Sequence, residues 1–313
     1  MNLALHYISF CATVLLLPPM LIAIIRKTKA RFQNRKGARF MQPYYDLNKF
    51  LSKGETISKV ASWVFRSTSV INLVTMTVLA VITPWLSYSP HLPDASDIFL
   101  IVYLFALARF FTVLAALDAG SVFGGFGASR EVTVALLAEP GVILCLASLG
   151  CVAHTSDLTQ VFSYSIAQSE LLYNQPALWL LAGSGLFLSA IVELSRMPID
   201  DPNTHLELTM IHEAMILENS GRNLALTEFA HYLKMAILLG LSGQCLLHAI
   251  PRMWVASGLV KGLASIGVIV FLALTIAVME SVLIKLQWKK LPEFIAYSVA
   301  MSLLCMLIAV GIR

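Results

Sequence analysis

Five ionisable residues stand inside or at the ends of long apolar runs of this sequence. They are Arg109, Asp118, Glu139, Glu193 and Glu280. In the hydrocarbon of a membrane, a charged side chain needs a partner, a water-filled cavity or a functional task. A buried carboxylate can also hold and release a proton near neutral pH, because burial disfavours its charged form. Four carboxylates on separate runs therefore indicate a relay that carries protons laterally through a membrane domain.

The same residues allow a second interpretation, in which static ion pairs only fix the packing of helices. Arg109 with Glu139 would be such a pair. Glu139 directly precedes Pro140 and Gly141, and a proline inside a helix frees backbone carbonyls and permits a bend. The sequence does not show which side chains face one another, so both interpretations stay open.

The remaining histidines, glycines and cysteines lack the spacing of known catalytic, phosphate-binding or metal-binding motifs. We therefore expect no catalytic or metal-binding residue. His205, Glu207, His212 and Glu213 form a cluster without the H-E-x-x-H spacing of a zinc site, so a solvated or partner-facing helix is expected there. The glycine-rich segment 120–127 has no Gly-Lys-Ser/Thr after it and predicts a flexible turn. The cysteines show no C-x-x-C spacing, so this chain should carry neither an iron–sulfur centre nor structural zinc.

The elements that position these residues must lie in a membrane. Of the 313 residues, 58% are hydrophobic and 13% are charged, and the mean hydropathy is +0.78, which excludes a soluble enzyme. A spanning helix needs about 20 apolar residues. The sequence predicts an all-α integral membrane protein, a single transmembrane domain over residues 1–313. About eight transmembrane helices are expected, near 3–25, 67–88, 97–118, 132–153, 175–195, 230–250, 259–284 and 293–312.

The distribution of Lys and Arg predicts the orientation. About half of the 22 Lys and Arg residues lie in 26–66, whereas 89–96 and 154–174 contain none. Cytoplasmic loops carry the excess of positive charge, so 26–66 should be cytoplasmic, and eight crossings then place the N- and C-termini outside. Residues 196–229 form a second large cytoplasmic loop, and we expect both loops to dock partners. The net charge of +4 comes from positive residues whose positions match the orientation of the chain in the membrane. This distribution indicates no nucleic-acid partner.

Three regions resemble the membrane subunit of complex I that is called ND1. Residues 34–49 follow the family pattern N-R-x-G-P…Q-P-x-x-D-x-x-K, with Ala38 in place of the proline. Residues 193–200 are similar to the acidic end of the family's fifth span and its Arg/Lys-x-P-x-D turn. Residues 218–221 are similar to its E-Y-S-G motif. The family also has eight spans.

Two further stretches look closest to the formate hydrogenlyase and hydrogenase-4 branch, the group 4 membrane-bound hydrogenases. They are residues 103–140 and the segment from Glu280 to Leu286. Residues 200–208 depart from the acidic D-x-x-E-A-E-x-E-L run of the family. In complex I this loop lines the quinone chamber, so quinone binding stays open for this chain.

The resemblance implies a non-catalytic subunit of an oxidoreductase complex in a prokaryotic inner membrane. This subunit would anchor a redox-driven ion pump and couple it to proton movement. A soluble iron–sulfur small subunit and a hydrogenase-like large subunit would dock on its cytoplasmic loops, and antiporter-like membrane subunits would lie beside it. The chain would hold no cofactor itself. Iron–sulfur clusters would belong to the partners, and a nickel–iron centre there stays open.

Under this resemblance the ionisable residues have two roles. Glu139, Glu193 and Glu280 would form the proton path, and Arg109 and Asp118 would tune it electrostatically. The residues expected to dock partners and couple to them are Arg35, Gln42, Asp46, Lys49, Arg130, Glu131, Arg196, Asp200, Glu207 and Glu218.

Three alternatives stay open. A stand-alone secondary transporter would use the same buried charges, although no internal repeat is visible between the two halves of the sequence. A purely structural anchor would have no proton path. An ND1-type subunit of a complex I-type dehydrogenase would form a quinone site near Asp200.

Overall fold

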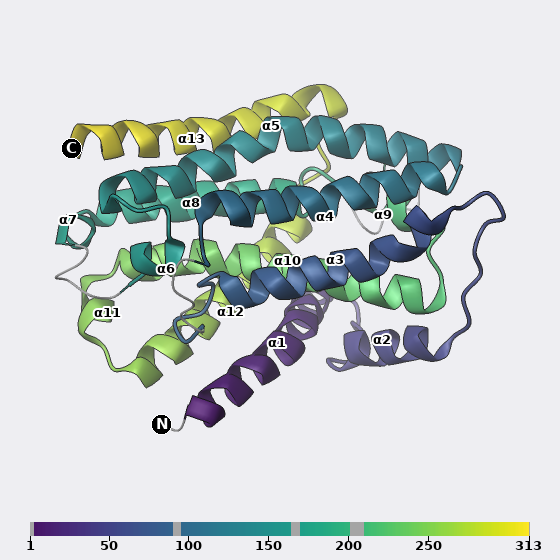
Figure 1. Cartoon of the computed structure of the whole chain (residues 1–313), viewed down its shortest axis with the longest axis horizontal. Helices are drawn as coiled ribbons and strands as arrows, with labels where there is room; N and C mark the ends of the chain where they lie inside the picture. Colours follow the sequence, from purple (N-terminus) through teal and green to yellow (C-terminus); the bar gives the residue numbers. More distant parts are fainter. Residues whose placement is uncertain (1–2, 90–94, 164–169, 201–209, 313) are drawn as a thin grey trace.

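The computed structural model describes residues 3–89, 95–163, 170–200 and 210–312. In these ranges the regular structure is helical, apart from one isolated β-bridge between Asp97 and Asp157 (Figure 1). In chain order the helices are α1 (Leu3–Phe32), α2 (Gln42–Ser52), α3 (Trp63–Ile82), α4 (Ile98–Asp118), α5 (Val122–Ala153), α6 (Leu158–Val161), α7 (Glu170–Tyr173), α8 (Pro176–Glu193), α9 (His212–Ile216), α10 (Gly221–His248), α11 (Pro251–Val255), α12 (Gly258–Val282), the 3₁₀ helix η1 (Trp288–Lys290) and α13 (Leu291–Ile312).

Eight helices of the described ranges are long and apolar enough to cross a membrane, which confirms the predicted number. They are α1, α3, α4, α5, α8, α10, α12 and α13. Three of them extend well beyond the expected ends, because α1 continues to Phe32, α5 begins at Val122 and α10 begins at Gly221. The span expected at 67–88 is shifted, since α3 begins at Trp63 and ends at Ile82. Hydropathy locates the ends of an apolar run but not the ends of the helix. The helix can continue through polar residues such as Lys29 beyond the apolar run.

Capping residues explain where several helices begin. Ser62, Asp97 and Ser121 precede α3, α4 and α5, and each side chain accepts a hydrogen bond from a backbone N–H of the first helical turn. These bonds satisfy N–H groups that have no partner inside the helix. Pro176 stands in the first turn of α8, where the missing N–H of proline has no cost.

The glycine-rich segment 120–127 is mostly helical, so our expectation of a flexible turn along all of it was wrong. Gly120 makes the turn with a φ of +68°, and α5 begins at Val122. A Cβ atom at Gly127 would lie 2.8 Å from the carbonyl oxygen of Ile211. The absence of a side chain there lets α5 pack closely against the segment that leads into α9.

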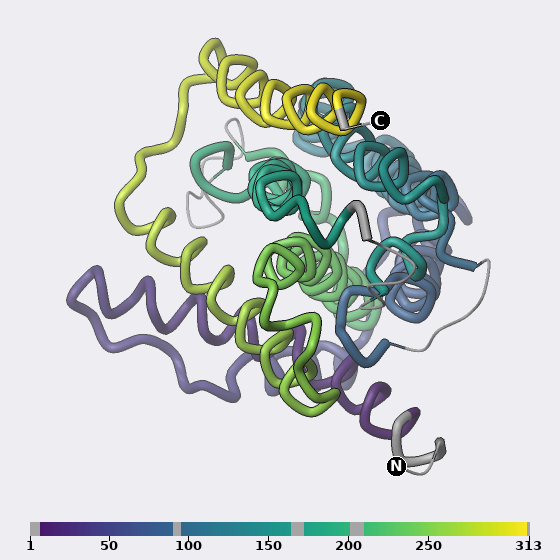
Figure 2. The backbone as a smooth tube through the Cα atoms, turned by 90° about the vertical axis from the view of Figure 1, so that its left-hand side faces the viewer, coloured from purple at the N-terminus to yellow at the C-terminus, as the bar shows by residue number. Residues whose placement is uncertain are grey.

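Helix α10 lies at the centre of the bundle. It contacts α8, α3, α12, α1 and α2, and all residues from Met235 to Cys245 are buried. Figure 2 shows α10 and α8 surrounded by the other long helices, with α13 and α5 along one side. Side chains on this buried part of α10 therefore lie inside protein and away from lipid, whereas Arg222 near the start of the helix is exposed.

Candidate functional site

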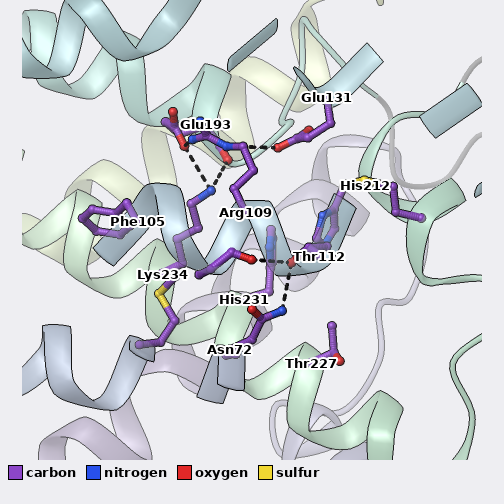
Figure 3. Close-up of a pocket in the computed structure, with 14 residues that line it drawn as sticks. Asn72, Phe105, Arg109, Thr112, Glu131, Glu193, His212, Thr227, His231 and Lys234 are labelled. Carbon is purple, nitrogen blue, oxygen red and sulfur yellow. Dashed lines mark hydrogen bonds and ion pairs between the residues drawn. The ribbon is translucent and has the colours of Figure 1, made fainter. Parts of the chain in front are cut away.

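Arg109 on α4 brings three carboxylates together, and Figure 3 shows two of them, Glu131 and Glu193. Its guanidinium donates hydrogen bonds to Glu139 of α5 and to Glu193 of α8. The Nε atom lies 3.8 Å from a carboxylate oxygen of Glu131, also on α5. Two of the three predicted proton-path carboxylates, Glu139 and Glu193, thus meet at one cation. The ion pair that the static interpretation expected, Arg109 with Glu139, is present.

Lys234 on α10 completes this central cluster, and we did not predict it from the sequence. Its Nζ atom lies 3.0 Å from a carboxylate oxygen of Glu193 and donates a hydrogen bond to the Glu193 backbone carbonyl at 2.9 Å. Lys234 is a charge inside a predicted span, so the rule that found Arg109 could have found it. Three carboxylates face two cations here, which leaves one negative charge in excess if all five groups are ionised.

A small cavity adjoins the central cluster. Its water-accessible volume is about 50 Å³. One water molecule needs roughly 10–15 Å³ by this measure, so the cavity has room for a few. Charged groups and two histidines contribute to its wall, which includes Arg109, Glu131, Glu193, Lys234, His212 and His231.

Glu280, the third predicted proton-path residue, belongs to a second cluster. One carboxylate oxygen lies 3.4 Å from Nζ of Lys29 on α1, and the other accepts a hydrogen bond from Arg196 at 3.1 Å. The Glu280 side chain is 2% exposed. The structure records no ion pair between Glu280 and the residues of the central cluster within the described ranges. The predicted path is therefore divided between two clusters.

The second cluster opens into a larger cavity of about 270 Å³. Its wall includes Glu280, Arg196, Asp200, Glu213 and Glu228. His212 and His231 line this cavity as well as the smaller one. The two cavities thus share a boundary made in part by these two histidines.

His212 and Glu213 lie on the short helix α9, which packs against α5 and α4. We expected a solvated or partner-facing helix here, but His212 and Glu213 line the larger cavity and their neighbours Ala214 and Met215 are buried. Burial, and secondly the carboxylate of Glu228, raise the pKa of Glu213 to about 7. Burial lowers the pKa of His212 to about 4. His205 and Glu207 lie outside the described residues.

Asp118 lies away from both clusters. Its carboxylate accepts hydrogen bonds from the Ser62 N–H at 2.8 Å, the Ser62 hydroxyl at 2.9 Å and the Phe65 N–H at 3.1 Å. Asp118 follows Arg109 by nine positions in α4, which is roughly 13 Å along the helix axis. Asp118 therefore joins the end of α4 to the start of α3, and it is not adjacent to the carboxylates that we expected it to tune.

Several residues predicted to dock partners are accessible. Arg35, Lys49 and Glu218 are exposed, and Gln42 and Asp46 are partly exposed on α2. Helix α2 packs against α10 and α1 beside the bundle (Figure 1). Within α2, the amide of Gln42 donates to the Asp46 carboxylate at 2.8 Å. Their side chains can reach a docked protein, so docking stays a prediction for them.

Three other residues predicted to dock lie inside the protein. Glu131 belongs to the central cluster, and Arg196 pairs with Glu280. Asp200 pairs with Lys285 at 2.7 Å and accepts a hydrogen bond from the Ile211 N–H at 2.7 Å. Side chains buried in this way do not present a surface to a partner, so only a coupling role remains open to them.

Arg130 is half-buried and bonded within the chain. It donates a hydrogen bond to the carbonyl of Met210 at 3.2 Å, and its guanidinium lies 5.8 Å from the ring centre of Trp288. Among the described residues, no group of three or more His, Cys, Asp or Glu side chains is placed to hold a metal ion.

Comparison with known proteins gives concordant results. The model of the NADH dehydrogenase family matches residues 5–310. Hydrogenase-4 component C of Escherichia coli (strain K12) is 32% identical over 229 residues, which cover 73% of this chain and 70% of that protein. Formate hydrogenlyase subunit 4 of the same organism is 30% identical over 225 residues, with 71% and 70% coverage.

The fold agrees with a solved membrane complex. A chain of the membrane-bound sulfane sulfur reductase, an archaeal respiratory membrane complex, superposes with a TM-score of 0.77 at 15% identity. The match covers 97% of this chain and 99% of that one. These comparisons confirm the resemblance found in the sequence motifs, including the hydrogenase-4 and formate hydrogenlyase branch. This chain is a multi-pass membrane protein of the NADH dehydrogenase family, which includes the ND1 membrane subunit of complex I.

Proposed function

We propose that this chain is the membrane anchor and proton-coupling subunit of a complex I-like, redox-driven ion pump in a prokaryotic inner membrane. The observation that carries the proposal is the central cluster of Arg109, Glu131, Glu139, Glu193 and Lys234. Charges in such number inside a membrane bundle are rare without a functional task. The two similar proteins are named as parts of a hydrogenase and of a formate hydrogenlyase, which favours a redox assembly.

The excess negative charge of the cluster suggests how it handles a proton. An unpaired carboxylate in a medium of low dielectric is costly, and binding a proton removes that cost. A proton that arrives at the cluster can therefore be held by one of the three carboxylates without a new counter-ion. The pairing with Arg109 does not prevent this, because the guanidinium is shared and can keep one carboxylate when another is neutral.

The partners belong to the same proposal. The exposed part of 26–66, including α2, would receive a soluble iron–sulfur small subunit and a hydrogenase-like large subunit. Iron–sulfur clusters, and a nickel–iron centre where the large subunit retains one, would sit in those partners. Antiporter-like subunits would pack on the lipid-facing helices. Electrons would stay in the docked module, and this chain would transmit their electrostatic effect to the proton path.

A quinone site is the weaker candidate. The wall of the cavity of about 270 Å³ near Asp200 combines apolar residues such as Ile22 and Leu194 with many charged ones, among them Arg196, Glu213, Glu228 and Glu280. Sites for ligands with large apolar parts are mostly lined by hydrophobic and aromatic side chains. Quinone-dependent turnover by the purified assembly, abolished by substitutions around Asp200, would favour this alternative.

The test is a proton-transport assay on the purified assembly in lipid vesicles. We expect Glu193→Gln to lower redox-driven proton uptake at least tenfold while the subunits still assemble. Glu293→Gln is the matched control, since Glu293 is exposed at the start of α13. If the Glu139→Gln and Glu193→Gln variants transport protons as fast as the unsubstituted assembly, then the chain is a purely structural anchor. Purification without any iron–sulfur subunit would favour a stand-alone transporter.

A further inference from the structure

His212 and His231 come from different helices and form a stacked pair. Their ring centres lie 4.4 Å apart, with 25° between the ring planes. His212 is the first residue of α9, and His231 lies in the first half of the central helix α10. Both residues are partly exposed, and both line the small cavity and the large one. In Figure 3 the two rings stand beside the central cluster, opposite Glu193 and Lys234.

The ring nitrogens of this pair differ from those of a histidine that only packs. Within the described part of the chain no hydrogen bond joins either ring to protein, although the structure records such bonds for His248 on the same helix. Both nitrogens of His248 lie near backbone carbonyls, that of Gln244 at 2.8 Å and that of Phe162 at 3.1 Å. His248 therefore has a packing role, and the same explanation does not fit the stacked pair.

The surroundings provide charged groups on both sides of the rings. Arg196, Asp200 and Glu228 line the larger cavity, and Glu193 and Lys234 line the smaller one. A neutral imidazole has one nitrogen that accepts a proton and one that donates, so it can take a proton on one side and release another on the opposite side. Two stacked rings do not share a charge easily, which limits the pair to one proton at a time.

We propose that His212 and His231 are the proton-transfer groups that connect the larger cavity, with Glu280 and Asp200, to the central cluster of Arg109 and Glu193. This inference rests on the proposed function, because it assumes that protons move between the two clusters.

The transfer is a proton movement alone. A protonated water or carboxyl group of the larger cavity gives its proton to one ring nitrogen. The N–H of the other nitrogen then passes its proton to water or to a carboxylate of the smaller cavity. The ring becomes neutral again as the opposite tautomer and is reset by rotation. No electrons are transferred, and no covalent bond other than N–H and O–H forms or breaks.

The experiment uses the complete assembly in lipid vesicles, with proton uptake normalised to assembled complex. We expect His231→Ala to lower proton uptake at least tenfold and added imidazole to restore a substantial part of it. A role in packing alone would not give this rescue in complexes that are already assembled. His248→Ala, on the same helix, is the matched control, and its proton uptake should not respond to imidazole.

A second variant covers the case in which His231→Ala does not assemble. His231→Phe keeps a ring for stacking and removes both nitrogens, and we expect the same tenfold loss. Proton uptake at the unsubstituted level in either assembled variant would overturn the inference. Glu193→Gln, measured in the same assay, separates the two proposals. A loss with Glu193→Gln alone would refute the histidine connection and keep the coupling function, whereas no loss in any variant would refute both.

Discussion

At the scale of single residues, Arg109 determines the character of the site. Its side chain is 8% exposed and it serves three carboxylates at once. Removing one partner of a buried ion pair costs about 3–5 kcal/mol, because it leaves a buried charge without compensation. The guanidinium of Arg109 thus links α4, α5 and α8 through ion pairs. It also sets the charge of the proposed proton path. The static and the relay interpretations describe two properties of one cluster.

Glu139 differs from the other carboxylates of the cluster. Its side chain is 37% exposed, whereas that of Glu193 is 6% exposed. The neighbouring residues Leu136 and Leu137 are exposed apolar side chains on the same helix. Glu139 therefore joins the interior of the bundle to an outer apolar face, where the proposed membrane partners would pack. Glu193 and Glu131 have no such access.

The pKa of Glu213 predicts how stability depends on pH. The folded pKa is raised to about 7 from 4.5, so the folded chain binds more protons than the unfolded chain between these values. Stability contributed by this group is therefore full below pH 4.5 and is lost as pH rises towards 7. We expect Glu213→Gln to raise the apparent Tm of the purified assembly at about pH 8 and to leave it nearly unchanged at about pH 5.

His212 opposes this effect over part of the range. Its folded pKa is lowered to about 4 from 6.5, so its contribution rises with pH between these values. The prediction concerns the difference in Tm between Glu213→Gln and the unsubstituted protein. When His212 has the same pKa in both proteins, its contribution is the same in both and drops out of this difference. Glu218→Gln is the control, since Glu218 is exposed. A difference in Tm that is the same at both pH values would contradict the prediction.

At the scale of elements, the contact between α4 and α3 depends on Asp118. One carboxylate oxygen accepts two backbone N–H bonds and one hydroxyl bond at the start of α3. Losing a helix-capping acceptor costs about 1–2 kcal/mol. We expect Asp118→Ala to lower the apparent Tm and to leave proton uptake per assembled complex unchanged. The measurements are thermal unfolding of the assembly and the vesicle assay.

Asp118→Asn separates hydrogen bonding from charge at this position. The amide keeps one oxygen that can accept the bonds of α3, so the loss of Tm should be smaller than for alanine. If Asp118→Asn lowers proton uptake as strongly as Glu193→Gln, then the charge of Asp118 does tune the path from a distance, as we expected from the sequence.

The sequence was sufficient for some elements and not for others. The eight spans follow from hydropathy, because apolar runs of sufficient length have few alternatives to a membrane helix. Arg109, Glu139 and Glu193 were found because charges in such runs are exceptional. Their meeting was not predictable, since Arg109 and Glu193 are 84 residues apart and their contact depends on the packing of four helices. His212 was misplaced because α9 is too short to show a periodic pattern.

At the scale of the whole molecule, the two clusters lie between different sets of helices. The central cluster joins α4, α5, α8 and α10, and the second joins α1 and α12 through Lys29 and Glu280. Helix α10 contacts helices of both sets, α8 of the first and α1 and α12 of the second. Its residues His231 and Lys234 are therefore placed to connect the clusters. A displacement of α10 would change both clusters together.

The distribution of positive charge predicts how the whole molecule is oriented in the membrane. Helix α1 carries Lys29 and Arg31 in its final turns, and the exposed segment after it adds Arg35, Lys36 and Arg39. Because positive segments stay on the cytoplasmic side, α1 should run from outside to inside. We expect a phosphatase that is active only outside the cytoplasm to be active when fused after Arg313. The same enzyme inserted at Gly54, in the segment between α2 and α3, should be inactive. A fluorescent protein that matures only in the cytoplasm should give the reverse result at both positions. Phosphatase activity at Gly54 would show that the topology is the inverse of the predicted one. The docking surface with α2 would then lie on the outer face, where no cytoplasmic redox module could reach it.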